Sequence, residues 1–228
     1  MSNYVYVHDV TLGIIDELGG YDKVFLDDGL YSHYYYRDHL SSLNVPIYFS
    51  IPTSFIYNGC VRRHFPKFKE PSVYMYEYHC KNIKSNFMTW DEVRSLKKYD
   101  NFYIVPHSHY HRTILTNGRC ENINDKWKRC LYKNKGFDCF DIISGFRSAL
   151  VENGFEIISG KLHKRNMNDL YDFIIRDTQL MMDMFLYELD DVPHDYVFPF
   201  NHQSDFLIDI LGNEFGFNNF YGKDRNEL

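Results

Sequence analysis

Short apolar runs separated by longer amphipathic stretches set the pattern of the first half of the chain. Val24-Phe25-Leu26 is too short and too isolated to be a helix, and it predicts a buried strand. Residues 45–51 are β-branched and aromatic, which favours a second strand, and residues 30–43 between the two are expected to form a helix. A strand, a helix and a strand within about thirty residues make a βαβ unit. The pattern therefore predicts a parallel sheet.

The alternation of strands and helices continues along the rest of the chain. Further strands are expected at residues 102–105, 196–200 and 215–221, and residues 4–7 form a first strand or its lead-in. Helices are expected at residues 12–18, 88–93, 142–150, 170–189 and 206–211. Two stretches fit neither pattern: residues 57–84 predict a long surface loop, and residues 117–135 an insertion rich in Asn, Lys and Cys. The expected fold class is α/β.

The helix start near Met88 is the clearest in the chain. Thr89 is expected to be the N-cap, and Glu92, three residues later, completes a capping box. Met88 and Val93 have the spacing of a hydrophobic staple. This helix leads into the strand expected at residues 102–105.

Two adjacent carboxylates follow the first buried strand. Asp27 and Asp28 come directly after Leu26, and Gly29 then lets the backbone turn sharply. Because successive side chains of an extended chain point in opposite directions, the two aspartates are not expected to do the same job. One can bind a cation while the other takes a proton. Asp-Asp-Gly is also an ordinary turn sequence, so the chemistry depends on what else lies nearby.

Two histidines follow the strand expected at residues 102–105. On a helical turn the four-residue spacing of His107 and His111 puts both imidazoles on one side, which suits two ligands of a single metal. Ser108 between them is a candidate for holding the turn by a hydrogen bond. One carboxylate added to the two histidines gives a site with open positions for water and substrate. Carboxylates and histidines at strand ends lie where parallel α/β folds place their sites.

These segments resemble the motifs of one family. Val24-Phe25-Leu26-Asp27-Asp28-Gly29 resembles the first motif of the polysaccharide deacetylases, the family of chitin, peptidoglycan and poly-N-acetylglucosamine deacetylases. His107-Ser108-His109-Tyr110-His111 matches their second motif, His-Ser/Thr-x-x-His, and Val197-Phe198-Pro199-Phe200-Asn201 is similar to an apolar form of the third. Residues 51–53 and 88–93 look like the family's intervening segments. The resemblance runs from about residue 21 to residue 221.

The resemblance implies a single catalytic domain over residues 1–228, folded as a distorted (β/α) barrel around a divalent metal, usually zinc. It implies that Asp28, His107 and His111 are the metal ligands, and that Asp27 is the general base that activates a metal-bound water. The implied activity is the removal of N-acetyl groups from an N-acetylated amino-sugar polymer or oligomer.

The third motif is expected to line the substrate at Pro199 and Phe200. The resemblance assigns the backbone N–H of Phe200 to the oxyanion that forms during hydrolysis. A backbone donor does not depend on the side chain, so a Phe at this position is compatible with the role.

Two family features have no counterpart here. The arginine that usually orients the base falls at Val197, and the C-terminal Leu-x-His that supplies the acid is absent. His202 is the only histidine after the third motif, and we expect it to be the candidate acid. The final barrel element would then be missing or supplied by a neighbouring subunit, which predicts an incomplete barrel.

Two other functions remain open. The same site could hydrolyse a non-sugar amide or another C–N bond, or the chain could be a non-catalytic glycan-binding relative that has lost its acid. Asp9, Asp16 and Glu17 lie where a signal peptide would need an apolar run. The expected location is therefore the cytoplasm of the producing cell, which modestly favours the hydrolase of a non-sugar amide or other C–N bond, unless the enzyme is released or carried by a virus.

Composition narrows the partners. With 228 residues and 44% hydrophobic residues the chain can fill one sizeable domain, and its net charge of −6 argues against a nucleic-acid partner. No segment approaches the roughly 18 apolar residues of a membrane span. Five cysteines without a C-x-x-C pair indicate mostly free thiols in a reducing compartment. The oligomeric state stays open.

The histidines outside the motifs are expected at the surface or in loops. They are His33, His39, His64, His79 and His194, with His163 in a basic loop at residues 161–165. The tyrosines at positions 31 and 34–36 are expected to belong to the core and the rim of the fold.

Overall fold

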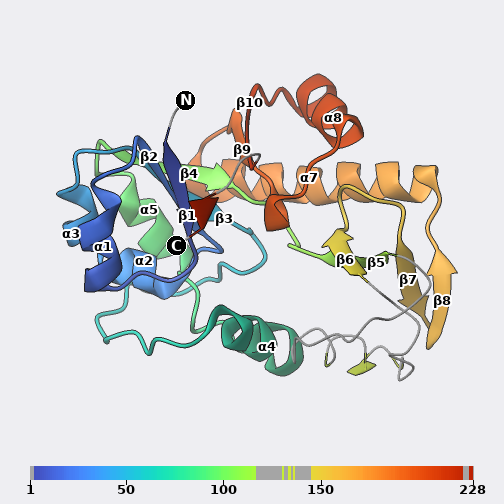
Figure 1. The fold of residues 1–228 in the computed structure, drawn as a ribbon, viewed down its shortest axis with the longest axis horizontal. Helices are drawn as coiled ribbons and strands as arrows, with labels where there is room; N and C mark the ends of the chain where they lie inside the picture. Colours follow the sequence, from blue (N-terminus) through green and yellow to red (C-terminus); the bar gives the residue numbers. More distant parts are fainter. Residues whose placement is uncertain are drawn as a thin grey trace.

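A five-stranded parallel sheet carries the N-terminal half of the fold (Figure 1). The computed structural model describes residues 3–116, 130, 133–134, 136, 145–222 and 226–227. The strand order is β11-β1-β2-β3-β4, and every neighbouring pair is parallel. The strands are β1 (Tyr4–Val7), β2 (Lys23–Asp27), β3 (Ile47–Ile51), β4 (Phe102–Pro106) and β11 (Asn226–Glu227). The predicted parallel sheet is confirmed.

Short helices pack beside this sheet (Figure 1). They are α1 (Leu12–Leu18), α2 (Tyr31–Tyr35), α3 (Arg37–Ser41) and α5 (Trp90–Leu96). The single helix expected over residues 30–43 is wrong in detail, because Tyr36 leaves the helical region at φ −92° and ψ 13° and separates α2 from α3. The capping box of α5 is confirmed: Glu92 N–H donates to Thr89 Oγ1, and Thr89 N–H donates to Glu92 Oε2.

The long surface loop expected at residues 57–84 is wrong in its second half, which forms α4 (Pro71–Lys81). Pro71 stands at the first turn, where its missing N–H costs nothing, and Asn82 ends the helix at φ 55°. Tyr74 and Met75 of α4 are buried against a small aromatic cluster that includes Phe55. The helix is therefore stabilised by tertiary packing that its irregular pattern of apolar residues does not reveal.

A second, antiparallel sheet has the strand order β6-β5-β7-β8. Its strands are β5 (Thr113–Thr116), β6 (Gly145–Ser148), β7 (Phe155–Ile158) and β8 (Lys161–Lys164). The helix expected at residues 142–150 is wrong, because residues 145–148 pair with β5 as a strand; residues 142–144 lie outside the described part. The basic loop expected at residues 161–165 is also wrong: Ser159 and Gly160, both at positive φ, form the turn of a β7–β8 hairpin. Most of the insertion expected at residues 117–135 lies outside the described residues.

The longest of the described helices, α7 (Met167–Leu189), extends from the parallel sheet toward β7 and β8 (Figure 1). The expected helix over residues 170–189 is confirmed, and a second capping box, Asn166 with Asp169, starts it. Helix α8 (Asp205–Phe215) runs past Gly212, where we expected its end, and stops at Gly216, whose φ of 77° suits a glycine. None of the described helices combines the length and the apolar character that crossing a bilayer requires.

The chain after α7 forms a parallel pair, β9 (Asp195–Val197) and β10 (Asn219–Tyr221). The strand expected over residues 196–200 ends at Val197, because Pro199 starts the short 3₁₀ helix η2 (Pro199–Asn201). Among the described strands, β4 is an edge strand of the five-stranded sheet and β9 is an edge strand of the two-stranded sheet, and no hydrogen-bonded ladder joins the two. The α/β class is confirmed, and these strands form open sheets instead of a closed barrel.

Aromatic side chains stack across the parallel sheet. The register pairs Tyr6 with Phe25, Phe25 with Tyr48, and Tyr48 with Tyr103. Their ring centroids lie 4.7, 4.8 and 4.9 Å apart in the same order, and all three pairs are stacked. Tyr221 of β10 packs on Phe25 at 4.9 Å. This aromatic ladder therefore joins the two-stranded sheet to the five-stranded one without a hydrogen-bonded ladder.

Candidate metal centre

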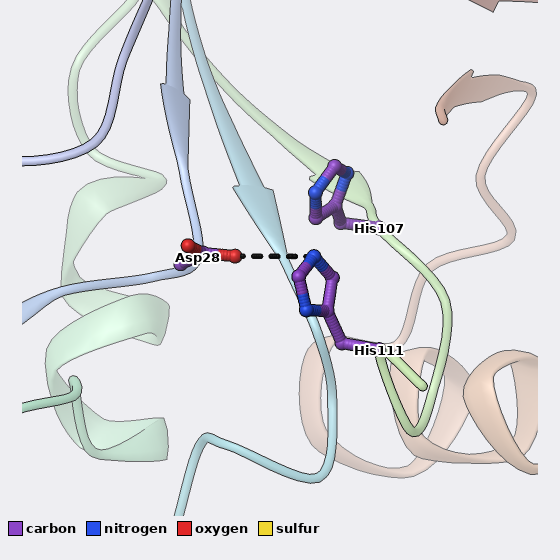
Figure 2. Close-up of side chains that lie close together, drawn as sticks. All are labelled: Asp28, His107 and His111. Atoms are coloured by element: carbon purple, nitrogen blue, oxygen red, sulfur yellow. Dashed lines mark ion pairs between the residues drawn. The ribbon is translucent and has the colours of Figure 1, made fainter. Parts of the chain in front are cut away.

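Two strands of the parallel sheet deliver the three side chains that the motifs single out (Figure 2). Asp28 follows β2 directly, and His107 follows β4 directly. These two side chains and His111 are all buried, and one ligand atom of each lies within 4.8 Å of the others. His111 Nε2 lies 3.4 Å from Asp28 Oδ1. The structure therefore brings the three expected metal ligands together.

His107 is fixed in one tautomer by the backbone. Its Nδ1 lies 3.0 Å from the carbonyl oxygen of Val197, and a carbonyl oxygen can only accept, so Nδ1–H is the donor. The other ring nitrogen, Nε2, then carries the lone pair that a metal requires. The resemblance to the deacetylases aligns Val197 with an arginine. The valine side chain carries no positive charge, but the Val197 carbonyl oxygen accepts the hydrogen bond from His107.

The backbone around the site is strained. Five residues other than glycine have positive φ here: Asp28 (71°), Ser108 (68°), His111 (49°), Phe200 (58°) and Asn201 (56°). Each such conformation costs on the order of 1–3 kcal/mol and persists only where surrounding contacts impose it. Gly29 is also at positive φ, and a Cβ there would lie 2.8 Å from Ile56 Cδ1. The strain concentrates on the two loops and the turn that carry the expected site residues.

Hydrogen bonds hold the His107–His111 loop in this conformation. His111 N–H donates to Ser108 Oγ at 2.9 Å, so the expected role of Ser108 is confirmed. The N–H groups of His109 and Tyr110 both donate to Asp177 of α7, each at 2.9 Å. Burial raises the pKa of Asp177 to about 6, against the two backbone bonds, which lower it. Asp177 is a buried residue of this otherwise largely apolar helix face, and its role in the site becomes visible only in the folded structure.

Asp27 is held by a residue that the sequence did not reveal. It is buried at the end of β2 and pairs in register with Ser50 of β3. Ser50 Oγ donates a hydrogen bond to Asp27 Oδ1 and lies 3.2 Å from the carbonyl oxygen of Leu26. The base candidate therefore has an orienting donor even though Val197 replaces the family's arginine. Cross-strand register decides this contact, and it becomes visible only in the folded sheet.

The expectation that His33 lies at the surface is wrong. Its ring is fully buried, and its Nε2–H donates to the carbonyl oxygen of His8 at 2.8 Å. Burial lowers the pKa of His33 to about 4, so the ring is neutral at pH 7. A short helix with a mixed pattern of polar and apolar residues can bury a histidine when the ring has a backbone carbonyl as its hydrogen-bond acceptor. His33 thus anchors the segment that carries His8.

His8 is the site residue that sequence analysis missed. It follows β1, the parallel neighbour of β2, so both chains leave the sheet at the same edge. His8 Nε2 lies 3.9 Å from Asp28 Oδ2, and 34% of its side chain is exposed. The placement of residues at the carboxyl ends of neighbouring parallel strands could have pointed to it.

Helix η2 covers the other side of the histidines. The ring of Phe200 packs on the ring of His111 with centroids 4.2 Å apart, and Pro199 beside it is buried. His202 Nδ1 accepts the backbone N–H of Ser148 at 3.0 Å, which ties this segment to β6. The His202 ring lies 6.1 Å from that of Phe200. Phe200 therefore contacts one of the three expected metal ligands directly, and His202 lies beside Phe200.

Solved structures of bacterial deacetylases share this fold. The deacetylase domain of BpsB from Bordetella bronchiseptica superposes with a TM-score of 0.63 at 17% identity, covering 96% of this chain and 87% of that one. A de-N-acetylase from Aggregatibacter actinomycetemcomitans gives 0.57 at 14% identity, covering 96% and 71%. IcaB from Ammonifex degensii gives 0.55 at 10% identity, covering 100% and 86%. No protein-family model and no curated protein matches the chain. The resemblance to the polysaccharide deacetylases is thus confirmed at the level of the fold.

We expect Asp28, His107 and His111 to bind a metal together. Replacing any one of them with alanine leaves two donors, so the variant, loaded with zinc beside the parent protein and purified in the same way, should retain less zinc than the parent. The metal content per chain, measured by atomic absorption, checks this. His39→Ala, which changes an exposed histidine, is the control and should keep its zinc. A full equivalent of zinc in all three alanine variants would contradict the ligand set.

We also expect Asp177 to control metal affinity without touching the metal. In Asp177→Asn an NH₂ group faces one of the two backbone N–H donors, so one hydrogen bond is replaced by repulsion. Affinity for zinc, measured by competition with a chelator, should fall roughly 10- to 100-fold, as for other groups that orient ligands. Asp183→Asn changes an exposed carboxylate of the same helix and should leave the affinity unchanged. Equal affinities in the two variants would remove Asp177 from this role.

Proposed function

We propose that this chain is a metal-dependent hydrolase that removes N-acetyl groups from an amino-sugar polymer or oligomer, using residues 1–228 as one catalytic domain. The observation that carries the proposal is the convergence of Asp28, His107 and His111 beside a second, separately held carboxylate, Asp27. A fold shared with bacterial deacetylases supports it. We take the open sheets to be an incomplete form of the (β/α) barrel.

The donor set fits a divalent metal, and Zn²⁺ is the ion we propose. Two imidazoles and one carboxylate are a common ligand set for catalytic zinc, and all three side chains are buried and within reach of one centre. His107 Nε2, with Nδ1–H held by Val197, is in the neutral form that binds a metal. When bound, such an ion lowers the pKa of a water molecule and polarises a carbonyl group.

Asp27 is the proposed general base. Asp27 and Asp28 are adjacent at the end of the strand, so their side chains point in different directions. Asp28 can therefore face the metal while Asp27 receives the proton of the attacking water. Ser50 fixes the carboxylate through Oδ1, and we assign the proton to Oδ2. Holding a base in one orientation contributes to the rate because the reacting atoms need no further alignment.

The oxyanion of the tetrahedral intermediate is proposed to accept a hydrogen bond from the backbone N–H of Phe200. The positive φ of Phe200 turns this peptide group relative to its neighbours, and the Phe200 ring packs on His111. Pro199 fixes the start of the turn. Together the two residues would form the wall against which the acetamide lies.

Two histidines are candidates for protonating the departing amine. His202 Nδ1 accepts a hydrogen bond from Ser148, so protonating that nitrogen would break the contact that holds the segment. His8 Nε2 lies 3.9 Å from Asp28, and the ring reaches solvent, from which it can recover a proton. We propose His8 as the acid and keep His202 as the alternative.

The activity is tested by acetate release. The zinc- or cobalt-loaded protein should release acetate from N-acetylglucosamine oligomers, and a chelator should abolish the release. Acetate from a non-sugar acetamide alone would favour the other C–N hydrolase. Glycan binding without turnover on any N-acetylated substrate would favour a non-catalytic binding module and contradict the deacetylase.

Asp27 and Asp28 should separate in a second measurement. Asp27→Asn should keep its zinc and lose about 10²- to 10⁴-fold in turnover, because only the proton acceptor is removed. Metal content and acetate release are measured on the same preparation. If Asp27→Asn lost its metal while Asp28→Asn stayed active, the two assignments would be exchanged.

The acid is identified by the leaving group. An amine must be protonated to depart, whereas the phenolate of an aryl acetate ester leaves without help. His8→Ala should therefore lower deacetylation of the glycan by about 10²-fold or more and affect the ester much less. His202→Ala should change both substrates alike. The reverse pattern would make His202 the acid, and no difference in either variant would leave Asp27, once it has taken the water's proton, as the donor.

A further inference from the structure

An open groove of about 370 Å³ lies between the β7–β8 hairpin and the N-terminal half of α7 (Figure 1). This volume falls within the roughly 300–1,000 Å³ of sites for small molecules. None of the residues that line the groove takes part in the proposed hydrolysis. They are Glu156, Ile158, His163 and Lys164 of the hairpin, Arg165 after it, and Asp169, Asp172, Phe173 and Arg176 of α7.

Arg165 is the buried charge of this groove. Only 4% of the residue is exposed, and its Nη2 donates to the carbonyl oxygens of Ala149 and Glu152, each at 2.6 Å. Among the described residues, Nε and Nη1 have no hydrogen-bond acceptor. A buried N–H group of a charged side chain that lacks an acceptor destabilises a fold. The guanidinium group therefore has two nitrogens available for an acceptor in the groove.

The nearest carboxylate does not supply that acceptor. Glu156 Oε1 lies 3.8 Å from Arg165 Nη1, which is too far for a hydrogen bond, and 47% of the Glu156 side chain is exposed. Glu156 therefore offsets the charge of the guanidinium group only from a solvated position. An oxyanion against Nε and Nη1 would provide both the hydrogen bonds and the closer negative charge.

Two further cations line the groove without a partner. Lys164 and Arg176 are exposed, and neither forms an ion pair with a residue that the structure describes. Lys164 directly precedes Arg165 in the chain, and Arg176 belongs to α7 on the other side of the groove. Positive charge thus reaches the groove from both of its walls.

The acidic residues of the lining do not cancel this charge. Glu156 faces Arg165, and Asp169 Oδ2 accepts the backbone N–H of Asn166 in the capping box of α7. Asp172 is the remaining carboxylate of the lining, and it is exposed. The available charge is therefore that of two cations and a buried guanidinium group against one solvated carboxylate, which favours an anionic group.

Two apolar side chains lie beside these charges. Ile158 is 53% exposed in the groove, and the Phe173 ring centroid lies 5.4 Å from Arg165 Cζ. An apolar or ring-shaped group next to the oxyanion would cover both side chains. The groove thus combines a cationic end with an apolar surface, as sites for small organic anions do.

We propose that this groove binds a small molecule that carries a phosphate or carboxylate group, with the oxyanion at Arg165 and an apolar or ring-shaped body on Ile158 and Phe173. Phosphate and carboxylate share the chemistry that a guanidinium group recognises, because both present charged oxygen acceptors. The site is separate from the proposed deacetylase centre and does not depend on its activity.

Two probes with one ring test the proposal. Phenyl phosphate and benzoate share a phenyl group and differ in the oxyanion, so calorimetric titration of the zinc-loaded protein with each should show binding and identify the preferred anion. Arg165→Lys keeps the charge but loses the guanidinium donors, and affinity should fall roughly tenfold or more. Lys164→Gln and Arg176→Gln should each weaken binding roughly two- to fivefold. Lys161→Gln, which changes an exposed lysine of the same hairpin outside the lining, should not.

The metal centre is the competing location for both probes. His107→Ala lacks a metal ligand, and it should bind the probes as the parent protein does. Loss of binding in His107→Ala, equal affinity of Arg165→Lys and the parent, or no binding of either probe would overturn the proposal. Circular dichroism checks the folding of Arg165→Lys. If it does not fold, the double variant Lys164→Gln/Arg176→Gln decides: weaker binding supports the groove, and unchanged binding overturns it.

Discussion

Parallel pairing with a fixed register is the constraint on which the site depends. The strands β1, β2, β3 and β4 all leave the sheet at one edge, so residues up to about a hundred positions apart in the sequence meet there. The register sets Asp27 opposite Ser50. A shift of one residue in any pair would turn every side chain of that strand to the other face and separate these groups. The motifs supply the reactive side chains, but the register of the parallel sheet is what brings them together.

The contacts that shape the site come mostly from outside the motifs. Asp177 of α7 holds two backbone N–H groups of the His107–His111 loop, and the carbonyl of Val197 holds His107. Hydrogen bonds to a charged group contribute about 1.5–3 kcal/mol each, which is comparable to the cost of one strained residue in the loop. The strained loop therefore persists because a buried carboxylate on a long, well-packed helix offsets its cost.

Local features of the fold could be predicted from the sequence, and non-local ones could not. The strand before Asp27 and the capping box at Thr89 depend on a few neighbouring residues, and both are confirmed. Helix α4 and strand β6 are stabilised by partners far along the chain, so their own patterns were misleading. The same reason hid Ser50 and His8, which join the site through strand pairing, and His33, whose burial depends on one backbone acceptor.

The aromatic ladder has a consequence for how this molecule can be observed. Its ring spacings of 4.7 to 4.9 Å match the spacing of neighbouring strands, about 4.7–4.9 Å, so the rings stack only while the strands are paired as described. Tyrosine rings held this close couple electronically, and the coupling appears as near-ultraviolet circular dichroism. Tyr6, Tyr48 and Tyr103 thus make the sheet its own optical probe, one that needs no label and reports on the scaffold separately from the metal centre.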